Sequence, residues 1–135
     1  MLAAAGLALL LAAGCQVGGR VTVGPREDEA SRLVVMEYCE ALRAGAYRAS
    51  FELLDRRTQQ RTPFDAYVAL RTRLDSSPAG RITKCTLGGM LAPDKGAPES
   101  ATSVALTMDY ENGPPQTLGL QTVVEDGRRK VYFPG

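Results

Sequence analysis

Hydrophobic residues recur at helical spacing through the middle of the chain and at alternating positions through its last third. From Ser31 onward they return every three or four residues, which predicts an amphipathic helix. Its apolar stripe consists of Val35, Tyr38, Cys39 and Leu42. The acidic residues 27–29 precede the expected helix start, and Gly45 supplies the expected end. A short second helix is predicted from the repeat of Tyr47, Phe51 and Leu54.

A polar run, Asp55 to Arg61, ends the pattern of the second helix. A third helix is then predicted from Pro63 to about Asp75. Thr62-Pro63-Phe64-Asp65 provides an N-cap residue, a proline at the first helical position and an acid three residues after the cap. The stripe that this helix should bury consists of Phe64, Tyr67, Val68 and Leu74.

After Gly80 the apolar period changes from 3.6 to 2, and four antiparallel strands are predicted. Their expected ranges are Arg81–Leu91, Ala101–Tyr110, Gln116–Glu125 and Lys130–Phe133. Gly88-Gly89 inside the first strand predicts a bulge or a sharp bend, and Asp126-Gly127 predicts a hairpin turn.

Three helices followed by a curved antiparallel sheet predict an α+β fold, and one segment narrows the choice. Val34–Leu54 resembles the opening of the nuclear-transport-factor-2-like, cystatin-like superfamily, in which an apolar helix ends in a small step of the form x-Gly-x-Tyr. The resemblance covers roughly residues 30 to 134. It implies that three N-terminal helices pack on a curved four-stranded sheet to form a cone that can enclose a pocket.

The N-terminal residues form an uncharged apolar stretch that ends at Cys15. The stretch is too short to cross a bilayer core, which needs roughly 20 helical residues, but it has the length of a signal-peptide core. Leu11-Ala12-Ala13-Gly14-Cys15 resembles the lipobox of bacterial lipoprotein precursors. The resemblance implies cleavage between Gly14 and Cys15 and attachment of palmitate-type acyl chains to Cys15.

We therefore expect a signal peptide at 1–14, a flexible tether at 15–29 and a folded domain at 30–135. The protein would be lipid-anchored at the cell membrane or the outer membrane and face the periplasm or the cell exterior. The alternatives are an ordinary secretory signal peptide and a buried apolar helix. Ala12 stands where lipoboxes prefer leucine, and no Lys or Arg precedes the apolar run. Because signal peptides begin with positive charge, we expect translation to start upstream of Met1; a precursor mass that begins at Met1 would contradict this.

Composition narrows the chemistry of the chain. Its 135 residues include 16 basic and 15 acidic side chains, so no nucleic-acid partner is expected. The sequence has no histidine, which removes imidazole bases, serine–histidine and cysteine–histidine nucleophile pairs and histidine metal sites. No cofactor is expected.

If Cys15 is acylated, Cys39 and Cys85 remain in a compartment that permits disulfides. Both lie on faces that are predicted to be apolar. A disulfide between them is one interpretation, and two buried reduced thiols are the other.

The resemblance also suggests candidates for a pocket, because ketosteroid-isomerase-like members of the superfamily place an acid and a tyrosine there. Tyr38, Tyr67 and Met108 are the candidate pocket-lining residues. Asp65 is explained by helix capping and Asp109 lies on the predicted solvent face, so neither is favoured as a general base. We therefore expect a module that binds a small ligand or an envelope protein. The alternatives are an isomerase or dehydratase that uses the pocket and a homodimeric scaffold that pairs through its sheets.

Basic residues suggest a further site. If the fold gathers them, they would bind an anion or a lipid headgroup; otherwise they are solvated surface charges. They are Arg56, Arg57, Arg61, Arg71, Arg73 and the run Arg128-Arg129-Lys130.

Overall fold

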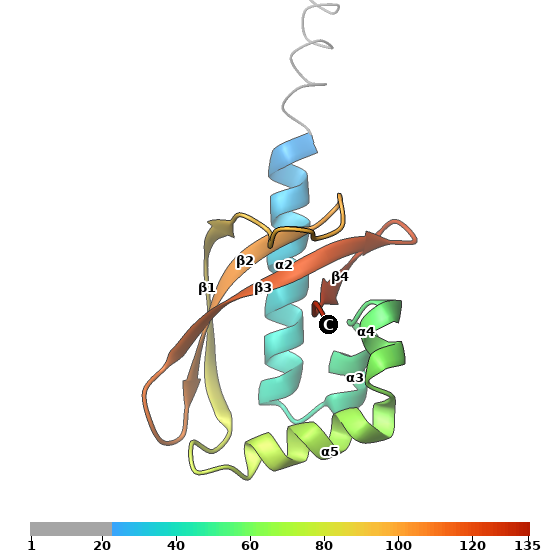
Figure 1. Cartoon of the computed structure of the whole chain (residues 1–135). Helices are drawn as coiled ribbons and strands as arrows, with labels where there is room; N and C mark the ends of the chain where they lie inside the picture. Colours follow the sequence, from blue (N-terminus) through green and yellow to red (C-terminus); the bar gives the residue numbers. More distant parts are fainter. Residues whose placement is uncertain (1–22) are drawn as a thin grey trace, which may run out of the picture.

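The computed structural model describes residues 23–135, with side chains from Glu27 onward. Its helices are α2 (Val23–Arg43), α3 (Tyr47–Glu52), α4 (Arg56–Arg61) and α5 (Phe64–Asp75). Its strands are β1 (Ile82–Leu91), β2 (Thr102–Tyr110), β3 (Gln116–Glu125) and β4 (Arg128–Tyr132). The strands pair antiparallel in the order β1-β2-β3-β4. The sheet curves around α2, and α5 runs across one end of the molecule, as Figure 1 shows.

The core lies between α2 and the concave face of the sheet. Val35 and Cys39 on α2 are fully buried, as are Val104 on β2 and Val131 on β4. Alternation along the strands directs Val104, Leu106 and Met108 to this face, as the period of two predicts.

Two predicted features of the sheet that involve glycine, a bulge and a hairpin turn, are confirmed. The β1–β2 register shifts between Leu87 and Met90, which places the predicted bulge at Gly88-Gly89. A Cβ on Gly88 would lie 2.8 Å from the Cβ of Ala105, so this close approach requires glycine. Asp126 and Gly127, with φ of 52° and 75°, form the hairpin turn between β3 and β4.

The helices differ from the prediction in three ways. First, α2 begins at Val23, so residues 23–29 are helical although they were predicted to be part of the tether. The Gly24-Pro25 pair suggested a break, but proline is compatible with the first turn of a helix. The acidic residues 27–29 therefore lie inside the helix and not ahead of it.

Second, the polar run forms an additional helix, α4, so there are four helices in residues 23–135 where three were predicted. The carboxylate of Asp55 caps α4 by accepting the backbone N–H of Thr58 at 3.3 Å. Third, Pro63 and not Thr62 occupies the N-cap of α5, and no side chain caps that helix. Leu74, which was predicted to be buried on α5, is 44% exposed.

A disulfide joins Cys39 on α2 to Cys85 on β1, and their Cα atoms lie 6.2 Å apart. The bond crosses from the central helix to an edge strand. It fixes the distance between two elements that are 46 residues apart in the sequence.

The convex face of the sheet carries small and polar side chains over β1 to β3. Thr107 and Thr117 exchange a 2.7 Å hydrogen bond there, and Lys84 pairs in register with Asp109. At the β3–β4 end, Val123 and Tyr132 pack under Ala97 and Ala101 of the β1–β2 connection. Within residues 23–135, no helix combines the length and apolar character that crossing a membrane requires.

Candidate functional site

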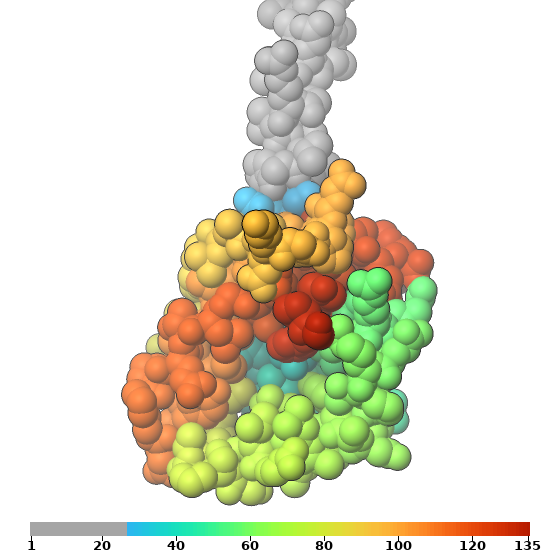
Figure 2. Space-filling model, in the orientation of Figure 1, coloured from blue at the N-terminus to red at the C-terminus, as the bar shows by residue number. Residues whose placement is uncertain are grey.

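A hollow of about 380 Å³ opens beside two of the predicted pocket residues, Tyr38 and Tyr67. It lies between α2, α4, α5 and the C-terminal residues that follow β4. Figure 2 shows α2, in teal, at the bottom of a recess between the red C-terminal residues and the lime α5. Its aromatic and aliphatic walls come from Tyr38, Leu54, Tyr67, Leu70 and Phe133.

Local contacts hold the wall that the C-terminal residues form. The backbone N–H of Phe133 donates to the hydroxyl of Thr58 at 3.2 Å, and Arg61 donates to the Phe133 carbonyl oxygen. Leu53 and Asp55 pair with Val131 through backbone hydrogen bonds, which fixes the preceding strand. The α3–α4 connection therefore covers the outer edge of β4 and positions Phe133 beside the hollow.

Two tyrosine hydroxyls lie at the hollow. The hydroxyl oxygens of Tyr38 and Tyr67 are 3.4 Å apart, and that of Tyr67 lies 2.6 Å from the hydroxyl of Ser50. Ser50 donates its single proton to the Tyr47 carbonyl oxygen at 3.0 Å, so the short contact uses the proton of Tyr67. In that arrangement the Tyr38 proton can be donated to the Tyr67 oxygen only across the longer, weaker 3.4 Å contact, so a closer acceptor could take it.

The Tyr38 hydroxyl stays protonated at neutral pH. Burial raises its pKa well above the usual value, and neighbouring Tyr67 raises it further, while the positive charge of Arg71 opposes both. Tyr38 is thus a hydrogen-bond donor and not a base.

Arg61 and Arg71 bring two guanidinium groups to the hollow. The Nε of Arg71 is buried and has no hydrogen-bond partner in the part of the chain that the structure describes. An unsatisfied buried donor costs about 1–3 kcal/mol. Arg61 donates to neutral oxygens, those of Thr58 and Phe133.

Carboxylates do not neutralise these two arginines. Among residues 27–135, neither guanidinium has an ion pair within 4.0 Å to a side-chain or terminal carboxylate. Asp75, one turn after Arg71, accepts the hydroxyl of Tyr47 instead, and this hydrogen bond raises the pKa of Tyr47. No aspartate or glutamate of the described residues lines the hollow.

The predicted pocket residues are thus only partly brought together. Tyr38 and Tyr67 line the hollow, whereas Met108 lies in the core with its sulfur 3.8 Å from the Tyr110 hydroxyl. Asp65 is exposed on α5, and Asp109 pairs with Lys84 in register on the convex face. Gly14 and Cys15 lie outside the described residues. Within residues 27–135, no three His, Cys, Asp or Glu side chains are grouped to hold a metal ion.

Comparison with known proteins identifies the architecture. No family model and no curated protein matches the chain. Among solved structures, the chain is similar to a crystal structure described as a "putative NTF2-like transpeptidase" from Campylobacter jejuni, with a TM-score of 0.55 and 10% identity. The match covers 82% of this chain and 100% of the other. The chain has an NTF2-like fold. At this identity the likeness shows the fold alone.

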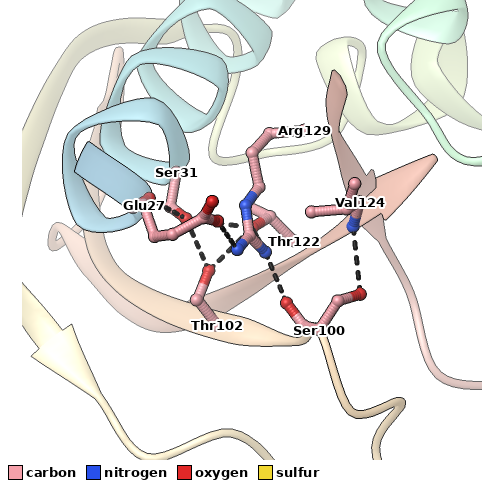
Figure 3. Close-up of polar contacts among 7 residues, drawn as sticks. All are labelled: Glu27, Ser31, Ser100, Thr102, Thr122, Val124 and Arg129. Atoms are coloured by element: carbon pink, nitrogen blue, oxygen red, sulfur yellow. Dashed lines mark hydrogen bonds and ion pairs between the residues drawn. The ribbon is translucent and has the colours of Figure 1, made fainter. Parts of the chain in front are cut away.

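The NTF2-like domain also holds a buried arginine near the N-terminal end of α2, within the polar cluster shown in Figure 3. Arg129 on β4 is 8% exposed and forms an ion pair with Glu27 of α2, whose side chain is 45% exposed. Arg129 also donates to the Ser100 carbonyl oxygen and, at 3.4 Å, to Thr122. Ser31 and Thr102 join Thr122 through hydroxyl contacts of 2.6 and 2.7 Å.

The other arginines predicted as a basic patch are dispersed over the NTF2-like domain. Arg56 pairs with Asp126 at 2.7 Å, and Lys130 donates to the Glu52 carbonyl oxygen. Only Arg61 and Arg71 line the hollow. The sequence flagged both residues, but they lie on different helices, so their convergence depends on the tertiary fold.

Proposed function

We propose that this chain is a lipid-anchored cell-envelope protein whose NTF2-like domain binds a small ligand in the hollow. The observation that carries the binding role is the hollow itself. Its walls are mainly aromatic and aliphatic, and a few polar groups converge in it, which is the usual composition of a small-molecule site.

Binding is favoured over carbon-acid catalysis. An isomerase of the ketosteroid type needs a base within hydrogen-bond reach of the reacting carbon. Tyr38 is held protonated, and no aspartate or glutamate of the described residues lines the hollow. The described side chains of the hollow therefore offer donors but no base.

The sheet gives less support to a homodimeric scaffold. Its convex face over β1 to β3 presents Thr86, Thr107 and Thr117 with small residues between them. A sheet-mediated dimer normally buries several large apolar side chains, whereas among the described residues of this face the exposed one is Leu91, at 48%.

The anchor rests on the lipobox resemblance. Seven residues separate Cys15 from the start of α2 at Val23, which span about 25 Å at most when extended. Tyr38 lies fifteen residues along α2, or about 22 Å from its start. In this proposal the domain stays near the membrane while the hollow lies at the distal half of α2.

One experiment tests the anchor. Full-length protein expressed in a bacterium is expected in the membrane fraction with acyl mass on Cys15, because the acylated thioether is the anchor. The Cys15→Ser variant is expected to lose both. Equal membrane retention without acyl mass would contradict lipid anchoring.

A second experiment tests the hollow. NMR titration of the full-length protein with benzoate and benzamide, two compact aromatic probes, is expected to show saturable binding. Leu70→Trp should abolish it by filling the hollow, whereas Leu74→Trp on the same helix should not, because Leu74 is outside the lining. Probe binding that ignores Leu70→Trp, or is absent from the wild type, would contradict the proposal.

A further inference from the structure

We infer that the ligand of the hollow is a small organic anion, held at its charged head by Arg71 and Arg61 and at its apolar body by the aromatic walls. This inference rests on the proposed ligand-binding function and adds the charge and shape of the ligand. Three observations support it. Arg71 and Arg61 line the hollow without an ion pair among the described residues, and the Tyr38 hydroxyl is a neutral hydrogen-bond donor.

Arg71 has an unused donor and an uncompensated charge. Its Nε is buried without a hydrogen-bond partner, and no carboxylate lies within 4.0 Å of it among the described residues. Its positive charge lowers the pKa of Tyr38, which also lines the hollow, against the larger effect of burial. A carboxylate head placed there would meet both the charge and the fork of N–H groups that guanidinium offers.

Arg61 approaches the same space from α4. Its guanidinium donates to two neutral acceptors, Thr58 and the carbonyl oxygen of Phe133. These contacts orient the group but do not neutralise its positive charge. Two guanidinium groups line the hollow and no described aspartate or glutamate does, which favours an anion there although the whole chain carries a net charge of only +1. A cationic ligand would meet repulsion from both.

Tyr38 supplies a neutral donor beside these charges. Because the contact between the Tyr38 and Tyr67 hydroxyls is long, at 3.4 Å, a closer anionic oxygen would compete well for the Tyr38 proton. The remaining surface comes mainly from Tyr67, Leu70 and Phe133, which suits a flat aromatic or short aliphatic body. The arginines and Tyr38 would therefore bind the charged head of an amphipathic anion, and the aromatic and aliphatic residues would bind its apolar body.

The test compares isosteric probes on the full-length protein. Benzoate, benzamide and benzylammonium share a ring and differ in charge, so NMR titration isolates the effect of the head. We expect benzoate to bind about tenfold or more tightly than benzamide, and benzylammonium to bind most weakly. Arg71→Gln should remove the benzoate preference and change benzamide affinity by less than about twofold, which also shows that the variant is folded.

Arg73→Gln is the matched control, because Arg73 is exposed on the same helix and does not line the hollow. It should leave the benzoate preference unchanged. Equal affinity for benzoate and benzamide would overturn the anion inference and leave the proposed binding function standing. Binding of none of the three probes would contradict the proposed function itself.

Discussion

Arg129 of β4 packs against the first turns of α2 and Arg71 of α5 lies beside its second half. The Nε of each lacks a partner within the described residues, but their surroundings differ. Arg129 forms an ion pair with Glu27 and donates to Ser100 and Thr122, so its charge is compensated inside the fold. Arg71 has no such carboxylate and lines a hollow. The first arrangement connects the helix to the sheet, whereas the second leaves charge available to a ligand. Charge compensation, more than burial, therefore separates a structural arginine from a binding one.

The largest expected effect comes from the disulfide that joins α2 to β1. Replacing Cys39 and Cys85 together by alanine should lower the free energy of unfolding by about 4 kcal/mol, because the disulfide restricts a long loop in the unfolded chain. Urea unfolding with and without reductant measures it. An unchanged midpoint in the double variant, with a wild type insensitive to reductant, would contradict this role.

The next effect tests Arg129, the compensated arginine. Glu27→Gln leaves the charge of Arg129 without its partner and should cost about 2 kcal/mol, less than the 3–5 kcal/mol of a fully buried pair because Glu27 is half exposed. Thermal unfolding at neutral pH is the measurement. Glu29→Gln, on an exposed position of the same helix, is the control. Equal small losses in both variants would show that the Arg129 cluster does not connect α2 to the sheet.

At Arg71, which has no carboxylate partner, the free energy of unfolding should change in the opposite direction. Arg71→Gln removes a charge without a carboxylate partner and a buried donor without an acceptor, so the free energy of unfolding should not fall and should rise by up to about 1 kcal/mol. Urea unfolding compared with Arg73→Gln checks it. A loss as large as that of Glu27→Gln would mean that Arg71 is structural.

The last effect appears only in alkali. Because burial raises the pKa of Tyr38, its contribution to stability is complete below about pH 10 and is lost as the pH rises toward the folded pKa. The wild type should therefore lose stability faster than Tyr38→Phe above pH 10, by up to about 1.4 kcal/mol per pH unit. Parallel pH curves for the two proteins would contradict the burial of this hydroxyl.

Much of this fold is predictable because its strands alternate cleanly. The exposed and buried positions of β2 and the bulge in β1 follow from a period of two and a glycine pair. By contrast, α4 was missed because six polar residues carry no apolar period, although Asp55 and Thr58 have the spacing of an N-cap. Local polar contacts form this helix, and they leave little trace in hydropathy.

The sequence predicts the two tyrosines of the site and, as members of a suggested basic patch, Arg61 and Arg71. Tyr38 and Tyr67 lie on apolar stripes that point inward, so the sequence places them near an interior space. Met108 also points inward, but neighbouring side chains pack around it, so it lies in the core and does not line the hollow. An alternating pattern of apolar residues does not reveal this difference. Arg61, Arg71 and Phe133 come from three separate elements, and only the closed cone brings them to one hollow.

The central claim is that Arg71 is free to bind an anion while Arg129 is not. Nitrogen-15 NMR of the arginine Nε–H groups in the full-length protein compares the two directly as benzoate is added. The account predicts a saturable shift of the Arg71 resonance with benzoate, a much smaller one with benzamide, and no shift of the Arg129 resonance. An Arg71 resonance that ignores benzoate, or equal shifts at both arginines, would contradict it.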